Sequence, residues 1–292
     1  MGFSSLDDMV SEITAGKFHR ADVNKITGAS AYTAGRWYDM SLLNGTPIAN
    51  AFAGTALTWK TCDETTGNGT QIFGIPHGGN VSPDTKHIVN VSALTAVATG
   101  VPAQLMLVDL QGYWPSISNN TTSAQTLLGT PTLRYTNGAG CRLFQVQTAA
   151  AGATAQNIAL SYTDSAGNAG NALPVTVSMT ASAIAGHISH SGTAANNYGP
   201  FLPLASGDTG VQNVATVTMS AANTGTFALC LAKPLLTIPI TTVSVAAERD
   251  LVNQLPSLPR VKDGACLVWL YFAGAATGAS TNFYLSSEFA WG

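Results

Sequence analysis

The feature that most constrains this sequence is a segment that occurs twice, about 125 residues apart. Residues 133–141 read LRYTNGAGC and residues 259–266 read PRVKDGAC, so each segment places an arginine before a turn dipeptide and a cysteine after it. Arg134 and Arg260 lie 126 residues apart, and the cysteines that end the two segments lie 125 apart. Solenoid repeats have periods of roughly 20–50 residues, so this spacing is typical of a duplicated domain.

Shorter matches extend the repeat on both sides. The pair Asp84 and Thr85 recurs as Asp208 and Thr209 after 124 residues. The spacing of the matches drifts only between 123 and 126, as small loop insertions would cause. Coincidence is the alternative in a chain rich in Ala, Thr, Gly and Ser. The scarcity of arginine and cysteine favours duplication.

The pattern between turn residues predicts short strands from about residue 30 onward. The dipeptides 137–138 (NG) and 263–264 (DG) are tight-turn signals at equivalent places in the two copies. We therefore expect an all-β chain with two tandem, similar antiparallel β-sandwich units of jelly-roll type. Residues 1–30 are the expected helical arm, 31–165 the first copy and 166–292 the second. A single sandwich with strands exchanged between the copies is the alternative. The expected strands are 88–94, 104–110, 141–148, 157–163, 174–180, 211–219, 226–232, 265–273 and 282–288.

A short amphipathic helix is expected near the start of the chain. Ser5 followed by Asp8 approximates a capping box, and Gly16 is a suitable stop. Apolar residues between them recur at helical spacing and form one stripe. So short a helix needs a surface, either its own domain or a neighbouring subunit. The stripe supplies four candidate assembly residues, which are Leu6, Met9, Val10 and Ile13.

A second helix is predicted over residues 245–255. Ser244 could cap its start, and Pro256 would end it.

Composition excludes several functional classes. Charged residues make up 9% of the 292 residues, against about 25% in ordinary soluble domains. The net charge of −3 gives little repulsion between copies, so we expect a surface that is covered in an assembly. A habitat-driven composition is the alternative. Six lysines and six arginines are dispersed along the chain, which predicts no nucleic-acid binding. No run approaches the roughly 18 apolar residues of a membrane span.

The cysteines are expected to be reduced. The first residues lack a basic region followed by a long apolar stretch, so no secretory signal is expected. Cytosolic thiols stay reduced. The repeat also makes Cys141 and Cys266 equivalent packing residues rather than a bonded pair. Cys62 and Cys230 are also expected to be reduced thiols.

No motif in the sequence carries recognisable chemistry. It has no phosphate-binding loop, no zinc-protease motif and no Cys-x-x-Cys pair. His187 and His190 could chelate a metal only within a turn, and the carboxylates give no reason to pair any two. We therefore expect no catalytic, cofactor-binding or metal-binding residue, and no enzyme. Exposed aromatic residues could stack on sugars, but buried packing is their commoner fate.

Arg134 and Arg260 are the remaining candidate assembly residues. Each precedes a turn at an equivalent place in the repeat. Either each braces its own copy, or both form a symmetric contact with a neighbouring subunit.

Short motifs resemble those of virion structural proteins of tailed bacteriophages. The motifs are residues 36–39 (RWYD), 77–79 (HGG), 133–141, 199–204 (GPFLPL) and 258–267. The resemblance implies a capsid-associated or tail-associated building block. We expect a protein that decorates or cements a capsid through apolar and strand-edge contacts. It would act as a trimer or other homo-oligomer, with major capsid or other virion proteins as partners. Neither a membrane nor nucleic acid is an expected partner. Its expected location is the virion, after synthesis in the host cytoplasm. A tail or neck component and a carbohydrate-binding or host-adhesion module are the alternatives.

Overall fold

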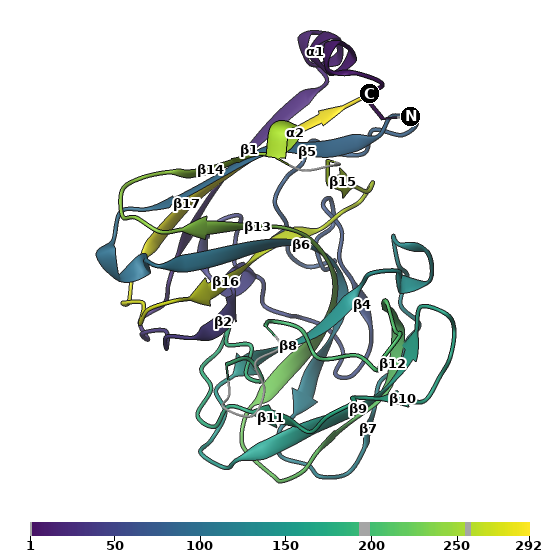
Figure 1. Ribbon diagram of the computed structural model, residues 1–292. Coiled ribbons are helices and arrows are strands. Elements are labelled where there is room, and N and C mark those ends of the chain that lie inside the picture. The colour runs from purple at the N-terminus through teal and green to yellow at the C-terminus, as the bar shows by residue number, and fades with distance from the viewer. Residues whose placement is uncertain (1, 193–198, 255–257) are drawn as a thin grey trace.

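The computed structural model describes residues 2–192, 199–254 and 258–292. It shows an all-β chain with a short helix near its start, which confirms the expected fold class. Three antiparallel sheets stack along the long direction of the molecule, with the helix at one end (Figure 1). The helical elements are α1 (Leu6–Thr14), α2 (Leu251–Gln254), η1 (Met40–Leu42), η2 (Ala98–Gly100) and η3 (Thr136–Gly138).

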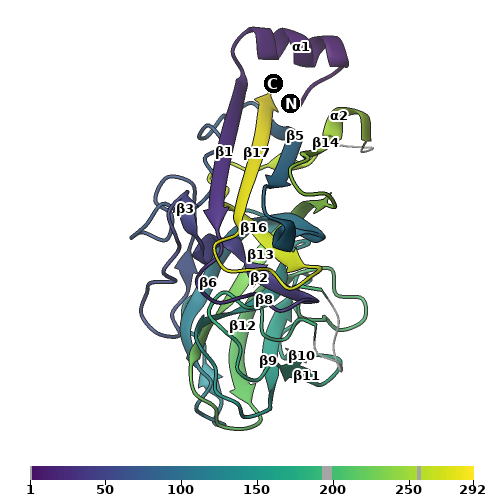
Figure 2. The same ribbon diagram turned by 90° about the vertical axis from the view of Figure 1, so that its left-hand side faces the viewer.

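The sheet next to α1 is called the outer sheet. Its strands β5, β17 and β1 lie side by side next to α1 and alternate in direction (Figure 2). In order, they are β14 (Ala247–Asp250), β5 (Lys86–Thr95), β17 (Asn282–Trp291), β1 (Phe18–Ile26) and β3 (Asn44–Thr46), with β15 (Arg260–Val261) also pairing with β5.

The central sheet contains the two longest strands of the molecule. In order, its strands are β2 (Arg36–Asp39), β16 (Leu267–Ala273), β6 (Ala103–Ser118), β13 (Thr226–Ile240) and β8 (Arg142–Ala149), with β4 (Lys60–Thr61) also pairing with β6.

The tip sheet lies at the end opposite α1. In order, its strands are β10 (Asn171–Ala172), β9 (Gln156–Asp164), β12 (Val211–Met219) and β7 (Gln125–Thr126), with β11 (Val177–Met179) also pairing with β9.

The central sheet is shared by two sandwiches. One stretch of β6, with Leu105 and Leu107, packs into a core with the outer sheet. Further along the same strand, Trp114 and Ile117 pack into a core with the tip sheet. A third core lies where residues such as Phe52 and loops cover other side chains of the central sheet. Strands covered on both faces need near-continuous apolar sequence, as β6 and β13 have.

Every sheet combines strands from both sides of the expected boundary at residue 165. The outer sheet pairs β5 with β17, and the tip sheet pairs β9 with β12. At the centre, β6 pairs with β13. Each of the three sheets therefore contains strands from before and after residue 165.

Corresponding ladders occupy corresponding positions in the sequence. Leu107 of β6 lies opposite Trp269 of β16, and Leu231 of β13 lies opposite Leu143 of β8. Leu107 and Leu231 are 124 residues apart in the sequence, and their partners Leu143 and Trp269 are 126 apart. In the ladder between β6 and β13, Asp109 lies opposite Lys233, and these two residues are also 124 apart. These spacings match those of the sequence repeat.

The same correspondence links the outer and tip sheets. Val91 of β5 lies opposite Ser287 of β17, and Val214 of β12 lies opposite Tyr162 of β9. The valines are 123 residues apart, and the other two residues are 125 apart.

The second predicted helix is wrong over most of its length. Residues 247–250 form β14 and pair with β5, and only one helical turn, α2, follows. Ser244 does not cap it, because its φ of 58° belongs to a turn. Instead the Asp250 carboxylate accepts the Val252 N–H at 2.9 Å. Pairing with β5 overrides the local helical pattern. Residues 255 and 256, the predicted end of the helix, lie outside the described residues.

Strand β1 was not predicted from the sequence. Its side chains alternate between solvent and core, with Ala21 and Val23 buried. It pairs along its full length with β17. Residues 18–26 of the expected arm are therefore part of the outer sheet.

Candidate assembly surface

Helix α1 begins and ends as its sequence predicts. The Ser5 hydroxyl accepts the Asp8 N–H at 3.1 Å, and the Asp8 carboxylate accepts the Ser4 N–H at 2.8 Å. These two bonds satisfy N–H groups that have no partner within the helix. At the other end, Gly16 has a φ of 90°, which glycine adopts without strain.

The four apolar residues of α1 have two different environments. Met9 is buried against Val89 and Ala290 of the outer sheet, and Ile13 packs beside it. Leu6 and Val10 are 60% and 54% exposed. The helix therefore docks on its own chain through one side and leaves two apolar side chains in solvent.

An ion-pair network fixes α1 to the loop before β5. The Lys17 ammonium lies 2.9 Å from Glu12 and 2.8 Å from Asp84. Hydrogen bonds to Asp84 and Glu12 raise the pKa of Lys17 above its usual value. The orientation of α1 on the sheet is thus fixed at its C-terminal end.

Strand β1 leaves one side unpaired beside α1. On that side β3 pairs only with Asn24–Ile26, and no other described strand pairs with residues 18–23. Phe18, at the start of this edge, is 38% exposed. Unpaired edges of this kind can accept a strand of another chain. Arg20 and Asp22 are exposed on the same strand and are typical of edges that limit such pairing.

Arg134, whose side chain is 12% exposed, contacts three segments of the chain. Its Nε lies 3.2 Å from Asp109 Oδ2, and one Nη also donates to the second oxygen of that carboxylate. The guanidinium also donates to the carbonyls of Cys62 and Leu110, both at 2.6 Å. All of these contacts lie within the chain itself.

Arg260 has a different environment from Arg134. It is exposed on β15, and its side chain makes no hydrogen bond or ion pair to any residue that the structure describes. Nevertheless, the two arginines line the same cavity, of about 280 Å³. The fold thus brings together two residues that are far apart in sequence.

A buried polar cluster lies beside this cavity and was not identified from the sequence. The Lys86 ammonium donates to His77 Nδ1 at 3.0 Å and to the His77 and Gly79 carbonyls at 2.6 Å. Because Nδ1 accepts, the imidazole is neutral with its proton on Nε2, which donates to the Ala265 carbonyl at 3.1 Å. Burial lowers the pKa of His77. Glu64 accepts the His77 backbone N–H at 2.6 Å.

Two signals could have revealed these contacts. Asp109 is the one charge within a strand of otherwise apolar and uncharged residues, so it needs a buried partner. Gly78 and Gly79, after His77, both have positive φ and mark a tightly constrained loop.

The two histidines considered as metal ligands are core residues. His187 is 3% exposed and stacks on Tyr38, and His190 is 1% exposed with Nε2 3.1 Å from the Pro200 carbonyl. Burial lowers their pKa to about 3 and about 4, respectively. In the described part of the chain, no three His, Cys, Asp or Glu side chains cluster as metal ligands.

The cysteines and carboxylates also have structural roles. All four cysteines are buried and free, and burial raises the pKa of Cys141 to about 12. Such thiols are unreactive. Asp164 accepts the backbone N–H groups of Ala166 at 2.8 Å and Asn168 at 2.9 Å. Tyr162 donates its hydroxyl to Asp208 at 2.6 Å.

None of the five tryptophans is exposed. Trp114 is fully buried, and Trp59 packs edge-on against it with ring centroids 4.6 Å apart. Sugar binding by stacking uses exposed aromatic faces. The tryptophans therefore give no support to a sugar-binding platform.

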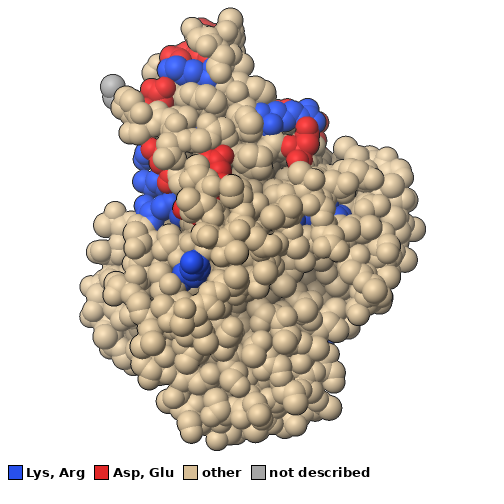
Figure 3. All heavy atoms as spheres, turned by 180° about the vertical axis from the view of Figure 1, so that it is seen from behind, with Lys and Arg blue, Asp and Glu red and all other residues tan. Residues whose placement is uncertain are grey.

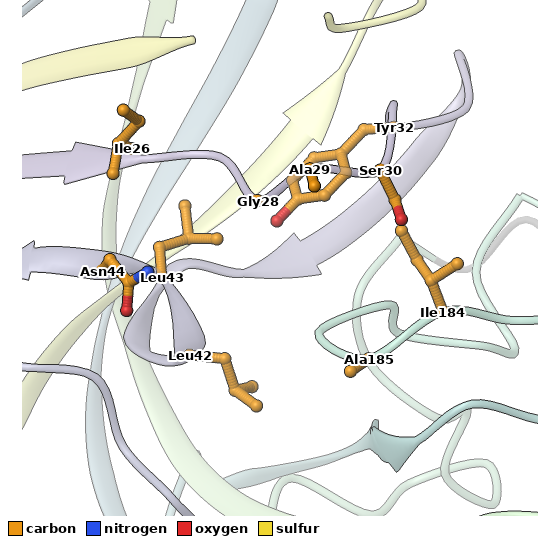
Figure 4. A pocket seen from close by; sticks show the side chains of 10 residues that line it. All are labelled: Ile26, Gly28, Ala29, Ser30, Tyr32, Leu42, Leu43, Asn44, Ile184 and Ala185. Atoms are coloured by element: carbon orange, nitrogen blue, oxygen red, sulfur yellow. The ribbon is translucent and has the colours of Figure 1, made fainter. Parts of the chain in front are cut away.

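A cavity of about 250 Å³ lies near the end of β1 (Figure 4). The Tyr32 ring lies along it, and Leu42, Leu43 and Ile184 supply apolar walls. The lining, taken from residues that the structure describes, contains no carboxylate, histidine or cysteine. The described lining therefore offers no pair of side chains for acid–base catalysis.

Charged residues gather at the end of the molecule that carries α1, in the view of Figure 3. The opposite end, in that view, shows only uncharged residues. Over residues 142–232 the only Lys, Arg, Asp or Glu residues are Arg142, Asp164 and Asp208. The segment that supplies β9, β10, β11 and β12 of the tip sheet is therefore nearly free of charged residues.

Comparisons with known proteins give no family. No family model and no curated protein matches the chain. A structure of infectious bursal disease virus, Gt strain, has 8% identity and a TM-score of 0.20, with 94% of this chain and 79% of that chain covered. The VP2 subviral particle of the same virus has 8% identity and a TM-score of 0.15, with 94% of this chain and 80% of that chain covered. Likenesses this low carry no argument about function.

No described helix has both the length and the apolar character needed to cross a bilayer.

Proposed function

We propose that this chain is a non-enzymatic structural protein of a virion, which decorates or cements the capsid of a tailed bacteriophage. It would be made in the host cytoplasm and assemble as a trimer or other homo-oligomer against major capsid or other virion proteins. A tail or neck position differs from this proposal only in location.

The observation that carries the proposal is the exposed side of α1. Leu6 and Val10 project into solvent from a helix that is already docked through Met9. Phe18 and the unpaired edge of β1 follow directly after the helix. Burial of the two aliphatic side chains against a partner would contribute about 1.5–3 kcal/mol each. An added strand could hydrogen-bond along the same edge.

We also propose that the chain arose by duplication, with strands exchanged between the copies. The paired ladders support this, because equivalent partners are separated by the same 123 to 126 residues as the sequence repeat. The pseudo-twofold axis would pass between Asp109 and Lys233. Three such chains would present six similar β units, which suits threefold or sixfold positions in a shell.

Light scattering coupled to size exclusion tests the role of α1. The wild-type chain should be an oligomer, and Leu6→Ser with Val10→Ser should be a monomer or dissociate about 100-fold more readily. Val175→Ser is a matched control, because Val175 is 41% exposed and lies among the short strands of the tip sheet. A wild-type chain that is a stable monomer and does not bind purified capsids would contradict the proposal.

A further inference from the structure

The cavity that contains both arginines has an unusual concentration of cations. It has a volume of about 280 Å³, and four of the twelve Lys and Arg residues of the chain line it. Two carboxylates also lie in its wall. The charged lining residues are Lys86, Arg134, Arg260, Lys262, Asp84 and Asp263.

Most of these cations lack a directly paired carboxylate. Among the described residues, only Arg134 has one within 4.0 Å, which is Asp109. Asp84 is engaged by Lys17 at 2.8 Å, outside the cavity lining. Asp263 accepts the Val81 N–H at 3.0 Å. Behind the wall, Asp109 balances Arg134 and the charge of Glu64 acts on Lys86. The rim cations Arg260 and Lys262 have no carboxylate within 4.0 Å among the described residues.

The walls of the cavity are held in place before any ligand arrives. The Gly264 N–H donates to Asn80 Oδ1 at 2.7 Å, and the Val81 N–H donates to Asp263, so the two rim loops are joined. Lys86 is fixed by the carbonyls of His77 and Gly79. Preorganised groups of this kind lower the entropy lost on binding.

Donors remain available within this frame. Arg134 uses four of its five N–H groups on Asp109, Cys62 and Leu110, which leaves one on Nη1. The side chains of Arg260 and Lys262 donate to none of the described residues. A ligand with several acceptor oxygens could use all three.

We propose that this cavity binds a small oxyanion of the phosphate or sulfate type. Arg260 and Lys262 donate from the rim, Arg134 offers its remaining N–H, and the buried Lys86 adds positive charge at the wall. The volume lies just below the roughly 300–1,000 Å³ of sites for drug-sized ligands, so it suits a small ion. A dianion with oxygens on several sides fits cations from several sides better than a monocarboxylate does. This inference goes beyond the proposed virion role and does not depend on it.

Isothermal titration of the full chain with inorganic phosphate at pH 7 and constant ionic strength tests the proposal. Arg260→Gln and Lys262→Gln should each weaken phosphate binding about tenfold or more, because each removes a charge-assisted hydrogen bond. Arg20→Gln is the control. Arg20 is an exposed arginine on β1 that pairs with Asp22 and Glu288, away from the cavity lining. It should bind phosphate like the wild type.

Circular dichroism melts of each variant establish that the fold is retained, as expected for side chains at the rim. Wild-type protein that takes up no phosphate would overturn the proposal. So would Arg260→Gln protein that binds phosphate as tightly as the Arg20→Gln control. Acetate that binds as tightly as phosphate at the same ionic strength would overturn the assignment to a phosphate-type ion.

Discussion

Arg134 and Asp109 form a two-contact ion pair inside the fold, with the carboxylate fully buried and the arginine side chain 12% exposed. Nε of Arg134 lies 3.2 Å from Oδ2, and the second contact closes on Oδ1. The same carboxylate accepts the Cys266 N–H at 3.1 Å. The pair therefore joins the turn before β8, the middle of β6 and the start of β16.

Removal of Arg134 should be strongly destabilising. Arg134→Leu leaves Asp109 charged, buried and unpaired, and loss of one member of such a pair costs about 3–5 kcal/mol. Arg260→Leu is the matched control, because the Arg260 side chain is exposed and makes no hydrogen bond or ion pair with the described residues. It should change the free energy of unfolding by less than about 0.5 kcal/mol. Urea denaturation measures both, and equal effects would show that the pair does not brace the fold.

Strand exchange makes a prediction about the two halves of the chain. Residues 1–165 contain β5, β6, β8 and β9, whose main partners β12, β13, β16 and β17 lie in residues 166–292. Each half expressed alone should therefore be unfolded by near-ultraviolet circular dichroism. Mixing the halves should restore the signal. Cooperative folding of either half alone would indicate two independent units.

The two sides of α1 should respond differently to truncation. Met9→Ala should lower the free energy of unfolding by about 2 kcal/mol, the low end for a buried methionine, because the Met9 cluster lies at the periphery and can relax. Leu6→Ala should change it by less than about 0.5 kcal/mol, because Leu6 is exposed. Thermal or urea melts of the two variants at a concentration where the chain is monomeric compare these values. A larger loss of stability for Leu6→Ala than for Met9→Ala would show that α1 does not dock through Met9.

Stability should fall as the pH drops from 6.5 towards 4.5. Burial holds the pKa of His187 at about 3 and of His190 at about 4, below the usual 6.5, so the unfolded chain takes up these protons first. Asp39 opposes them, since burial raises its pKa from 3.8 to about 6. The two histidines outweigh Asp39 by one proton, so the free energy of unfolding falls by about 1.4 kcal/mol per pH unit. Burial also lowers the pKa values of His77 and His87, which adds loss of the same sign.

Two variants separate these contributions. His190→Gln removes one depressed histidine and should flatten the pH dependence of the unfolding free energy. Asp39→Asn removes the opposing carboxyl and should steepen it, while the amide oxygen can still accept the Ser41 N–H, a 2.7 Å bond in the native protein. Urea denaturation at pH 7, 6 and 5 gives the slopes. A wild-type stability that rises on acidification would contradict the assignment.

Local signals predicted the elements whose sequence and environment agree. The spacing of Leu6, Met9, Val10 and Ile13 predicts α1, but the side of the helix that is buried depends on where it docks. Strand β1 escaped prediction because Lys25, a charged residue, is 4% exposed and points inward. Its ammonium is satisfied by the backbone carbonyls of Leu43 and Pro47, which no sequence pattern reveals.

The candidate residues show the same limit. The equivalence of Arg134 and Arg260 is visible in the sequence, but their different environments depend on long-range pairing. Under a spacing of 124 residues, the counterpart of Asp109 is Lys233, which lies opposite it in the ladder. A lysine cannot neutralise an arginine, so Arg260 has no equivalent carboxylate there. The shared cavity arises only because β15 pairs with β5 across the chain.

The proposed function is tested most directly by a count of this chain in purified phage particles from cells that carry its gene. Quantitative mass spectrometry against the major capsid protein gives the number of copies per particle. A decorating or cementing protein should be present in hundreds of copies at a fixed ratio. About a dozen copies or fewer would place it in the neck or tail. Its absence from washed, intact particles would contradict a virion structural role.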